Sequence, residues 1–535
     1  MRVLQKYFTA ASLTFILLAL LICLLGQIFN HSVFANADAL QYQAFSLDLL
    51  QHHYPLSGWM FFVTPNFLIV ILLYVPFYFL TQNFLLCFLI LELIEISLLI
   101  LLLILINKSI YPSNYKFTIL PILIFIDFML IVYRHDQSLL YDIFSHCHFI
   151  SFLLSLGILW FIFTFWNKKI NWVFKSGIFF FSFFVVISDQ LILAMFFAPS
   201  LLSAIGCYWK KKQIPLSLFK FLLLGSFSAF VLTRFVHFHQ LHVSLSFKDV
   251  SVFITTLPLF FKGVNAIYFA IWISCFVGIS FLFVSLIRSR SLIKNLDFNS
   301  NEDILTFWFF FLFFLPIVLL ASALSTGEFE GILSSRYLTA ALILPIFGWI
   351  TFILVYLNLF FGPKFVTVAC IFLTSLLLIF FLPNSKVSLW PYWLHQYPAE
   401  TACLDHINKQ LKTKYGLTDY WNSRLINSYS KFNLWTNQIN KDGTIDWYLN
   451  NKFWYLHEKN NQNLPKYSFV IDDPKKQFDS SQYFGKPDKV FYCKQAGFKI
   501  KETILIYNQT KSITQLNRKY LQINSVFFKK LTRNS

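Results

Sequence analysis

The sequence predicts an all-α polytopic membrane protein of about 11–12 transmembrane helices with a small C-terminal α/β domain outside the membrane. Of its 535 residues, 57% are hydrophobic, 20% aromatic and only 13% charged, whereas a soluble domain carries roughly a quarter charged residues. The apolar residues form blocks of about 17–25, long enough to cross a ~30 Å hydrocarbon layer. The tail is polar and has no such block. This composition excludes a cytosolic enzyme, a disordered chain and a nucleic-acid-binding module, so we expect no nucleic-acid partner.

The apolar runs predict the helices of the membrane domain. The first run, 9–29, follows Arg2 and Lys6. It is long for a signal peptide and has no convincing cleavage site behind it, so we expect an uncleaved first helix. The later runs are also expected to be helical, because lipid leaves no partner for an open backbone. They are 61–80, 84–106, 117–133, 147–166, 174–187, 189–207, 216–236, 266–287, 304–324, 337–358 and 364–383.

The distribution of Lys and Arg predicts the orientation. The most basic loops are 167–169, 209–212, 288–294 and 362–364. Basic loops prefer the cytoplasm, which places loop 30–60 and the tail on the outer face. We therefore divide the chain into a membrane domain, 1–383, with an external loop at 30–60, and an extracytoplasmic domain, 384–535. The expected location is a bacterial inner membrane, with the C-terminal domain in the periplasm.

One segment conflicts with this orientation. If 61–80 and 84–106 both crossed the membrane, 107–116 would lie outside, whereas the later basic loops require it inside. Either one of the two runs is re-entrant, or the preference of basic loops for the cytoplasm is broken at one connection. Eleven full crossings and an external tail are the preferred arrangement.

The first external loop carries the strongest candidate for chemistry. Asp38 is followed by Tyr42, Phe45 and Leu49 at helical spacing, which predicts an amphipathic helix at the membrane surface. Asp38 lies near the start of this helix, where a carboxylate is favoured by the helix dipole. It is either a helix cap or a general base or metal-holding carboxylate at the lipid–water boundary.

The segment from Asp38 to Tyr42 and the helix that follows resemble the first external loop of the C-type (GT-C) glycosyltransferase superfold. This group includes the protein O-mannosyltransferases, the lipid A aminoarabinose transferases and bacterial relatives. The resemblance implies a polyprenyl-phosphate sugar donor, with Asp38 as the catalytic acid residue that acts on the acceptor. Ala39 follows Asp38, whereas the family commonly has an Asp-Glu pair.

A second similarity lies before a late span. Arg336 and Tyr337 enter the run 337–358 from outside, which is similar to a pattern in bacterial members of the superfold. An arginine fork can hold two phosphate oxygens, so Arg336, Tyr337 and Arg234 are candidates for binding the donor phosphate. The alternative is that these arginines only anchor helices at the membrane interface.

The tail is expected to form one small α/β domain. Its pattern predicts a helix over 399–412 and strands over 467–472 and 504–507. Blocks that include Trp421 and Trp447 resemble segments of bacterial membrane proteins of this shape. Aromatic rings beside Asp and Asn can stack on sugars, so Trp421, Trp447 and Tyr42 are weak candidates for acceptor contact; equally, rings of this kind pack any small domain.

Two cysteines stand alone in the tail. Cys403 and Cys493 can pair if the tail faces an oxidising compartment and stay reduced if it is cytosolic. The sequence leaves both outcomes open.

Histidines supply the candidates for a metal site. His237, His239 and His242 lie within six residues, and a His-x-His pair can hold zinc. No carboxylate lies inside the cluster, so interfacial histidines are the simpler interpretation. Whether the protein binds a divalent metal therefore stays open, and the sequence implies no other cofactor.

The function expected first is a membrane glycosyltransferase, a hexosyl- or pentosyltransferase that moves a sugar from a polyprenyl-phosphate donor to a cell-envelope glycan, lipid or protein. One alternative is a transporter or flippase that uses Glu92 and Glu95, since carboxylates inside a span usually face a protein interior or a water path. Another is a polymerase or ligase of lipid-linked saccharides.

Overall fold

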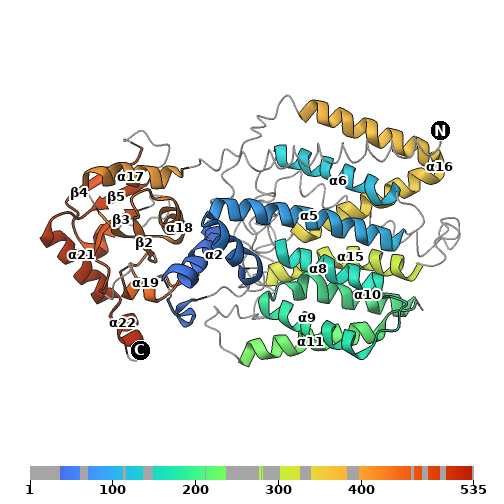
Figure 1. Cartoon of the computed structure of the whole chain (residues 1–535), viewed down its shortest axis with the longest axis horizontal. Coiled ribbons are helices and arrows are strands. Elements are labelled where there is room, and N and C mark those ends of the chain that lie inside the picture. The colour runs from blue at the N-terminus through green and yellow to red at the C-terminus, as the bar shows by residue number, and fades with distance from the viewer. Residues whose placement is uncertain are drawn as a thin grey trace.

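The computed structural model of the chain describes residues 37–52, 54–60, 70–111, 116–135, 149–210, 212–235, 276, 278, 280, 302–325, 339–381, 397–411, 413–458, 463–472, 480–494 and 502–532. These residues form a bundle of helices and a small C-terminal domain with one sheet, and Figure 1 shows the short helix α2 (Ala37–Leu47) between them. A mostly helical chain with a small C-terminal sheet was expected from the sequence and is confirmed.

The helices of the bundle follow the predicted apolar runs closely. They are α5 (Phe84–Ile110), α6 (Lys116–His135), α8 (Phe149–Thr164), α9 (Trp172–Ser188), α10 (Ala198–Trp209), α11 (Leu216–Phe235), α15 (Glu302–Ser325) and α16 (Thr339–Phe381). One π-helical turn, η5 (Leu193–Phe197), leads into α10. The predicted runs 337–358 and 364–383 are the two halves of α16, which breaks at Gly362, where φ is 77°. The runs 9–29 and 266–287 lie outside the described residues, apart from positions 276, 278 and 280.

The bundle is held together mainly by apolar packing. α9 packs on α11, α10 on α15, α6 on α16, and α5 on both α6 and α8. Directional contacts between these helices involve isolated polar pairs. Thr374 Oγ1 donates to Asp127 Oδ2 at 2.7 Å, and Ser151 donates to Asp189. Close packing of apolar side chains therefore carries most of the contact between the described helices of the bundle.

Two helices among the described residues are long and apolar enough, by length and composition, to cross a membrane: Phe84–Ile110 and Glu302–Ser322. Shorter apolar helices of 10–17 residues make up much of the rest of the bundle.

The C-terminal domain alternates helices and strands. Its helices are α17 (Ala399–Leu411), α18 (Tyr420–Tyr429), α19 (Phe453–Leu456), α20 (Ser480–Phe484), α21 (Thr510–Ile523) and α22 (Ser525–Thr532). Its strands are β1 (Tyr415–Thr418), β2 (Trp435–Gln438), β3 (Tyr467–Asp472), β4 (Lys489–Tyr492) and β5 (Thr503–Ile506). The helix expected over 399–412 and the strands expected over 467–472 and 504–507 are confirmed as α17, β3 and β5.

The five strands form one mixed sheet in the order β2-β1-β3-β5-β4. β2, β1 and β3 are parallel, whereas β5 runs antiparallel to both β3 and β4. A disulfide joins Cys403 on α17 to Cys493, just after β4, with Cα atoms 5.9 Å apart. It ties a helix to the edge strand across 90 positions of sequence. The sequence left open whether Cys403 and Cys493 are paired or reduced, and in the structure they are paired.

The segment between Trp59 and Phe84 begins and ends at the same end of the bundle. Trp59 forms a β-bridge with Asn451 of the C-terminal domain. At the other end of the segment, the ring of Phe84 contacts that of Tyr429 at 5.1 Å. The two elements that precede Phe84 are η4 (Val70–Tyr74) and α4 (Val75–Thr81). The ring of Tyr74 lies 6.1 Å from that of Tyr42 on α2. Both ends of this segment are therefore fixed beside the C-terminal domain, and α5 leads away from it.

Candidate functional site

The candidate site is the junction where the first loop docks on the C-terminal domain, and its central group is the carboxylate of Asp48. Asp48 begins the π-helical turn η2 (Asp48–His52), which continues from α2. Its side chain is fully buried. Trp454 Nε1 donates to both carboxylate oxygens, at 2.8 and 2.9 Å, and Asn451 Nδ2 donates to Oδ2 at 2.8 Å. These donors offset the cost of removing a carboxylate from water.

A buried cation lies beside this carboxylate. Arg424 of α18 is 1% exposed, and its guanidinium lies 5.0 Å from the ring of Trp454 and 5.8 Å from that of Trp59. One guanidinium nitrogen donates to the carbonyl of Leu449. Burial lowers the pKa of Arg424, while nearby charges, including those of Asp48 and Asp446, oppose the shift. An arginine stays charged in proteins, so the two rings and Asp48 stabilise a permanent positive charge.

The aromatic rings form one continuous cluster across the junction. Trp59 of the loop meets Trp454 edge-on at 5.5 Å and Phe45 of α2 at 5.5 Å. Trp454 also meets Trp435 of β2 at 4.8 Å. Asn437 of β2 fixes the backbone of Trp454, because its Nδ2 donates to the carbonyl of Trp454 at 2.9 Å. The position of Asp48 is therefore coupled, through Trp454, to the sheet.

Backbone hydrogen bonds complete the junction around Gly58. Met60 N donates to Asn450 O at 2.9 Å, and Lys452 N donates to Gly58 O at 2.8 Å. Trp447 Nε1 donates to the same carbonyl of Gly58 at 3.0 Å. A Cβ at position 58 would overlap Asn451 Oδ1 and the ring of Phe453, so only glycine permits this close approach.

The predicted surface helix is present as α2, but its apolar face is covered by protein. Tyr42 and Phe45 are both 5% exposed, and α2 packs on α18. The helix ends at Leu47, so Leu49 lies on the following turn and is partly exposed. Tyr42 contacts Tyr74 rather than solvent, which disfavours the prediction that Tyr42 contacts an acceptor sugar. Asp38 lies in the first turn of α2, and its side chain lies outside the described part of the chain.

The two tryptophans predicted to contact sugar have different surroundings. Trp447 is half-buried and bonded to the first loop, and its ring meets that of Phe527 at 6.2 Å. Its contacts therefore assign it to the junction. Trp421 is 39% exposed at the start of α18, with its ring 5.3 Å from that of Tyr420. Of these two candidates, Trp421 is the more exposed.

Several predicted residues lie outside the described residues. Arg336, Tyr337, His237, His239 and His242 are among them, and Arg234 is described only as a position in the last turn of α11. Within the described ranges, no group of three or more His, Cys, Asp or Glu side chains is placed to hold a metal ion.

Glu92 and Glu95 lie on α5, and both are buried, at 0% and 2% exposure. They face the interior of the protein, as carboxylates in an apolar helix are expected to do.

Sequence reasoning missed the residues that bring the junction together: Asp48, Arg424, Asn451, Trp454 and Trp59. One signal was present. Asp48 stands between Leu47 and Leu49-Leu50, and a charge inside an apolar stretch is almost never buried without a partner. That signal does not identify the partner of Asp48, because Asn451 is 403 positions away in the sequence.

The junction can fix the position of the loop, but its central carboxylate is not placed to act as a base. Asp48 is fully buried and accepts hydrogen bonds from Trp454 and Asn451, so it is a poor candidate for abstracting a proton from a substrate. Its effect is to hold the C-terminal end of α2, the helix that begins beside Asp38. No family model matches the chain, and no curated protein or solved structure matches it significantly.

Proposed function

We propose that the chain is an integral membrane glycosyltransferase that moves a sugar from a polyprenyl-phosphate donor to a cell-envelope acceptor on the outer face. The observation that carries the proposal is the junction: α2, which contains Asp38, is attached at its other end to the C-terminal domain through Asp48. The resemblance in the first loop implies a loop acid and a C-terminal domain on the same face. The contacts of α2 with α18 support that layout.

Membrane insertion is supported by the outer surface of the bundle. Large apolar side chains are exposed along its helices, including Phe360, Val368 and Phe372 on α16 at 65–67%. An exposed apolar surface of this extent is typical of a lipid-facing or partner-facing surface. The C-terminal domain buries the residues of β1, β2 and most of β3, whereas the edge strand β4 is largely exposed. The domain also contains a disulfide, and disulfides persist in oxidising compartments. These features favour an extracytoplasmic tail.

The conflict over 61–116 has a solution within this proposal. Both ends of the segment from Trp59 to Phe84 lie beside the C-terminal domain, so this segment returns to the outer face and α5 is the crossing that follows. The connection after α5 is then cytoplasmic, as the later basic loops require. Lys364 follows the break in α16, which Figure 1 places at the end of the bundle away from the C-terminal domain. Eleven crossings and an external tail remain our preferred topology.

In the proposed reaction, Asp38 acts as general base on the acceptor hydroxyl or amine. Arg336, with Tyr337 and Arg234, neutralises the departing polyprenyl phosphate, because charge that develops in a low-dielectric site is strongly stabilised by fixed cations. The junction keeps α2 in place against the C-terminal domain while the acceptor binds.

The experiment compares cell-envelope glycans and lipid-linked sugars by mass spectrometry in a deletion strain, its complement, and strains that carry Asp38→Asn or Glu92→Gln. Membrane levels of each variant are measured in parallel. We expect Asp38→Asn to match the deletion, with one sugar missing from a glycan and the donor lipid accumulating, while Glu92→Gln behaves as the complement.

A transporter is the second candidate, favoured by the burial of Glu92 and Glu95 inside α5. If Glu92→Gln fails at normal membrane levels and Asp38→Asn behaves as wild type, the transferase proposal is wrong and Asp38 is a helix cap.

A further inference from the structure

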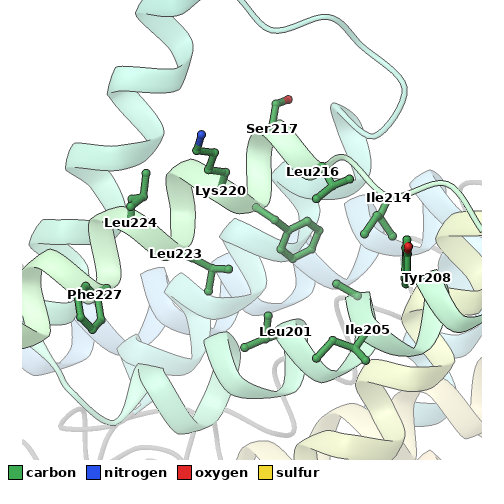
Figure 2. A pocket seen from close by; sticks show the side chains of 12 residues that line it. Leu201, Ile205, Tyr208, Ile214, Leu216, Ser217, Lys220, Leu223, Leu224 and Phe227 are labelled. Carbon is green, nitrogen blue, oxygen red and sulfur yellow. The ribbon is translucent and has the colours of Figure 1, made fainter.

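Two surfaces of the protein differ in how closely they specify a ligand. The groove between α10 and α11, of about 850 Å³, is lined almost wholly by apolar side chains, and Figure 2 shows the polar ends of Lys220 and Ser217 directed away from α10. Such a lining favours any apolar occupant equally. The surface at the start of α18, in the C-terminal domain, combines exposed aromatic carbon with carboxylates and is more specific.

Three aromatic rings meet at the start of α18. The ring of Tyr420 lies edge-on to that of Trp421, at 5.3 Å, and to that of Tyr448, at 5.6 Å. Trp421 is 39% exposed, Tyr448 is half-buried and Tyr420 is buried. Tyr420 therefore holds the two outer rings in place, and Trp421 is the more exposed of these two.

Two carboxylates lie beside these rings. Tyr448 N donates to Asp446 Oδ1 at 3.0 Å, and the other oxygen of Asp446 accepts no hydrogen bond from the described residues. Asp419 caps α18 by accepting from Trp421 N at 2.8 Å. Burial raises the pKa of Asp446, and the charge of Asp419 adds to the increase, against the lowering effects of Tyr448 N–H and Arg424. The half-buried Asp446 thus offers an acceptor next to a second negative charge.

The position of this surface in the sheet is one where ligands commonly bind. β2, β1 and β3 are parallel neighbours in that order, so the chain leaves β1 for one side of the sheet and later returns to the other side. The carboxyl end of β1 is therefore a topological switch point, and open α/β sheets bind their ligands at such points. Asp419 and Trp421 directly follow β1.

We propose that this surface binds a neutral oligosaccharide, with a sugar ring packed on Trp421 and a sugar hydroxyl donating to Asp446. The C–H face of a pyranose covers aromatic carbon while its hydroxyl groups donate to carboxylates, so one ligand satisfies both features of the surface. An anionic ligand would be repelled by Asp419 and Asp446.

The site lies at the end of α2 that is remote from Asp38, because α2 and α18 pack in opposite directions (Figure 1). Arg424, in the first half of α18, lies near Asp48, which follows α2. Tyr429, at the other end of α18, lies near Tyr74, whose ring contacts one from the first half of α2.

This separation specifies the acceptor of the proposed transferase. α2 has 11 residues, which is about 16 Å at 1.5 Å per residue. A single sugar unit does not reach from Asp38 at one end of α2 to Trp421 beyond the other. The acceptor is therefore an oligosaccharide of several units. This last step rests on the proposed function, whereas saccharide binding at Trp421 does not.

The test is saturation-transfer NMR of the purified full-length protein in a detergent without a sugar head group, since a glycoside detergent would compete. The probes are chitotetraose, which is neutral, and tetragalacturonate, an anion of the same length. We expect the wild type to bind chitotetraose more tightly. Trp421→Ala should weaken chitotetraose binding about tenfold, and Trp421→Phe, which keeps a ring, should retain most of it. Asp446→Asn should weaken it about threefold and reduce the discrimination against tetragalacturonate.

Phe432→Ala is the matched control. Phe432 is 43% exposed and lies between α18 and β2, at the opposite end of the parallel strands, so its removal should leave chitotetraose binding unchanged. The proposal is overturned if the wild type binds chitotetraose no better than tetragalacturonate, or if Trp421→Ala and Phe432→Ala have the same effect.

The two proposals can fail separately, because this experiment measures binding and not sugar transfer. If chitotetraose binds through Trp421 while the Asp38→Asn strain has wild-type glycans, the saccharide site stands and its assignment as an acceptor site is wrong. If Asp38→Asn matches the deletion while chitotetraose does not bind, the transferase proposal stands and the saccharide site is wrong.

Discussion

Two buried carboxylates show how differently the two regions of this molecule are held together. Asp48, at the junction of loop and tail, accepts hydrogen bonds from Trp454 and Asn451 and lies near a buried arginine. Asp127, in the bundle, accepts one bond from Thr374, and its Oδ1 has no hydrogen-bond partner among the described residues. The described helices of the bundle are held mainly by packing of apolar side chains, whereas the junction also depends on a few directional contacts. A single substitution should therefore disturb the junction more than the bundle.

The largest effect is expected from Asp48→Ala. Removing the carboxylate leaves the buried Trp454 Nε1 and Asn451 Nδ2 without their acceptor, which costs about 1–3 kcal/mol for each donor. It also removes one of the negative charges near Arg424, where Asp446 remains. Asp127→Asn should cost only about 1 kcal/mol, because it alters one hydroxyl hydrogen bond. The measurement is the free energy of unfolding of the purified full chain in detergent, followed by tryptophan fluorescence.

A conservative variant sharpens this comparison. Asp48→Asn keeps an oxygen that can accept from Trp454 Nε1 but removes the charge, so its cost should fall between those of Asp48→Ala and Asp127→Asn. Equal destabilisation by Asp48→Ala and Asp127→Asn would show that the junction is no more dependent on polar contacts than the bundle.

Two glycines give a second comparison, in which the expected changes in stability are of intermediate size. Gly58→Ala forces a Cβ onto Asn451 and Phe453 and should destabilise the junction by about 1–3 kcal/mol, as overpacking does. Gly157→Ala on α8 meets no atom within 4 Å and should stabilise its helix by about 0.5–1 kcal/mol. Limited proteolysis of the loop and thermal unfolding of both variants provide the measurement. A Gly58→Ala protein with wild-type protease resistance would mean that the loop can dock without the close approach.

The same difference explains what could be predicted from the sequence. The bundle helices were predictable because a long apolar run satisfies its backbone hydrogen bonds by forming a helix, and runs such as 84–106 and 117–133 correspond to α5 and α6. β3 was predictable because its alternating and β-branched residues are local signals. The pairing of Asp48 with Asn451 and Trp454 was not, since it depends on docking two segments 403 and 406 positions apart. The coverage of α2 by the tail was missed for the same reason: a helix with an apolar face does not specify whether lipid or protein covers it.

The smallest expected effect is a pH dependence of the junction that depends on Tyr54. Its ring lies nearly parallel to those of Phe453 and His457, with centroid distances of 6.4 Å to each, and those two rings are 6.1 Å from one another. Burial, helped by the negative charge of Asp48, raises the pKa of Tyr54 to about 12 from its ordinary value of 10.0. Because the folded state holds the proton more tightly, the contribution of this group to stability is complete below pH 10 and is lost as the pH rises through 12.

Unfolding free energies between pH 10 and 12 test this dependence. The wild type should lose stability more steeply than Tyr54→Phe, which has no phenol to ionise. Asp48→Asn provides the sharper test, because removing the negative charge should lower the pKa of Tyr54 and move the loss of stability to lower pH. Parallel curves for the wild type and Tyr54→Phe would mean that Tyr54 is not held in the junction in solution. A pH profile unaffected by Asp48→Asn would mean that the carboxylate and the phenol do not interact. Either result would reduce the contrast between the junction and the bundle to the contacts of Asp48 with Trp454, Asn451 and Arg424.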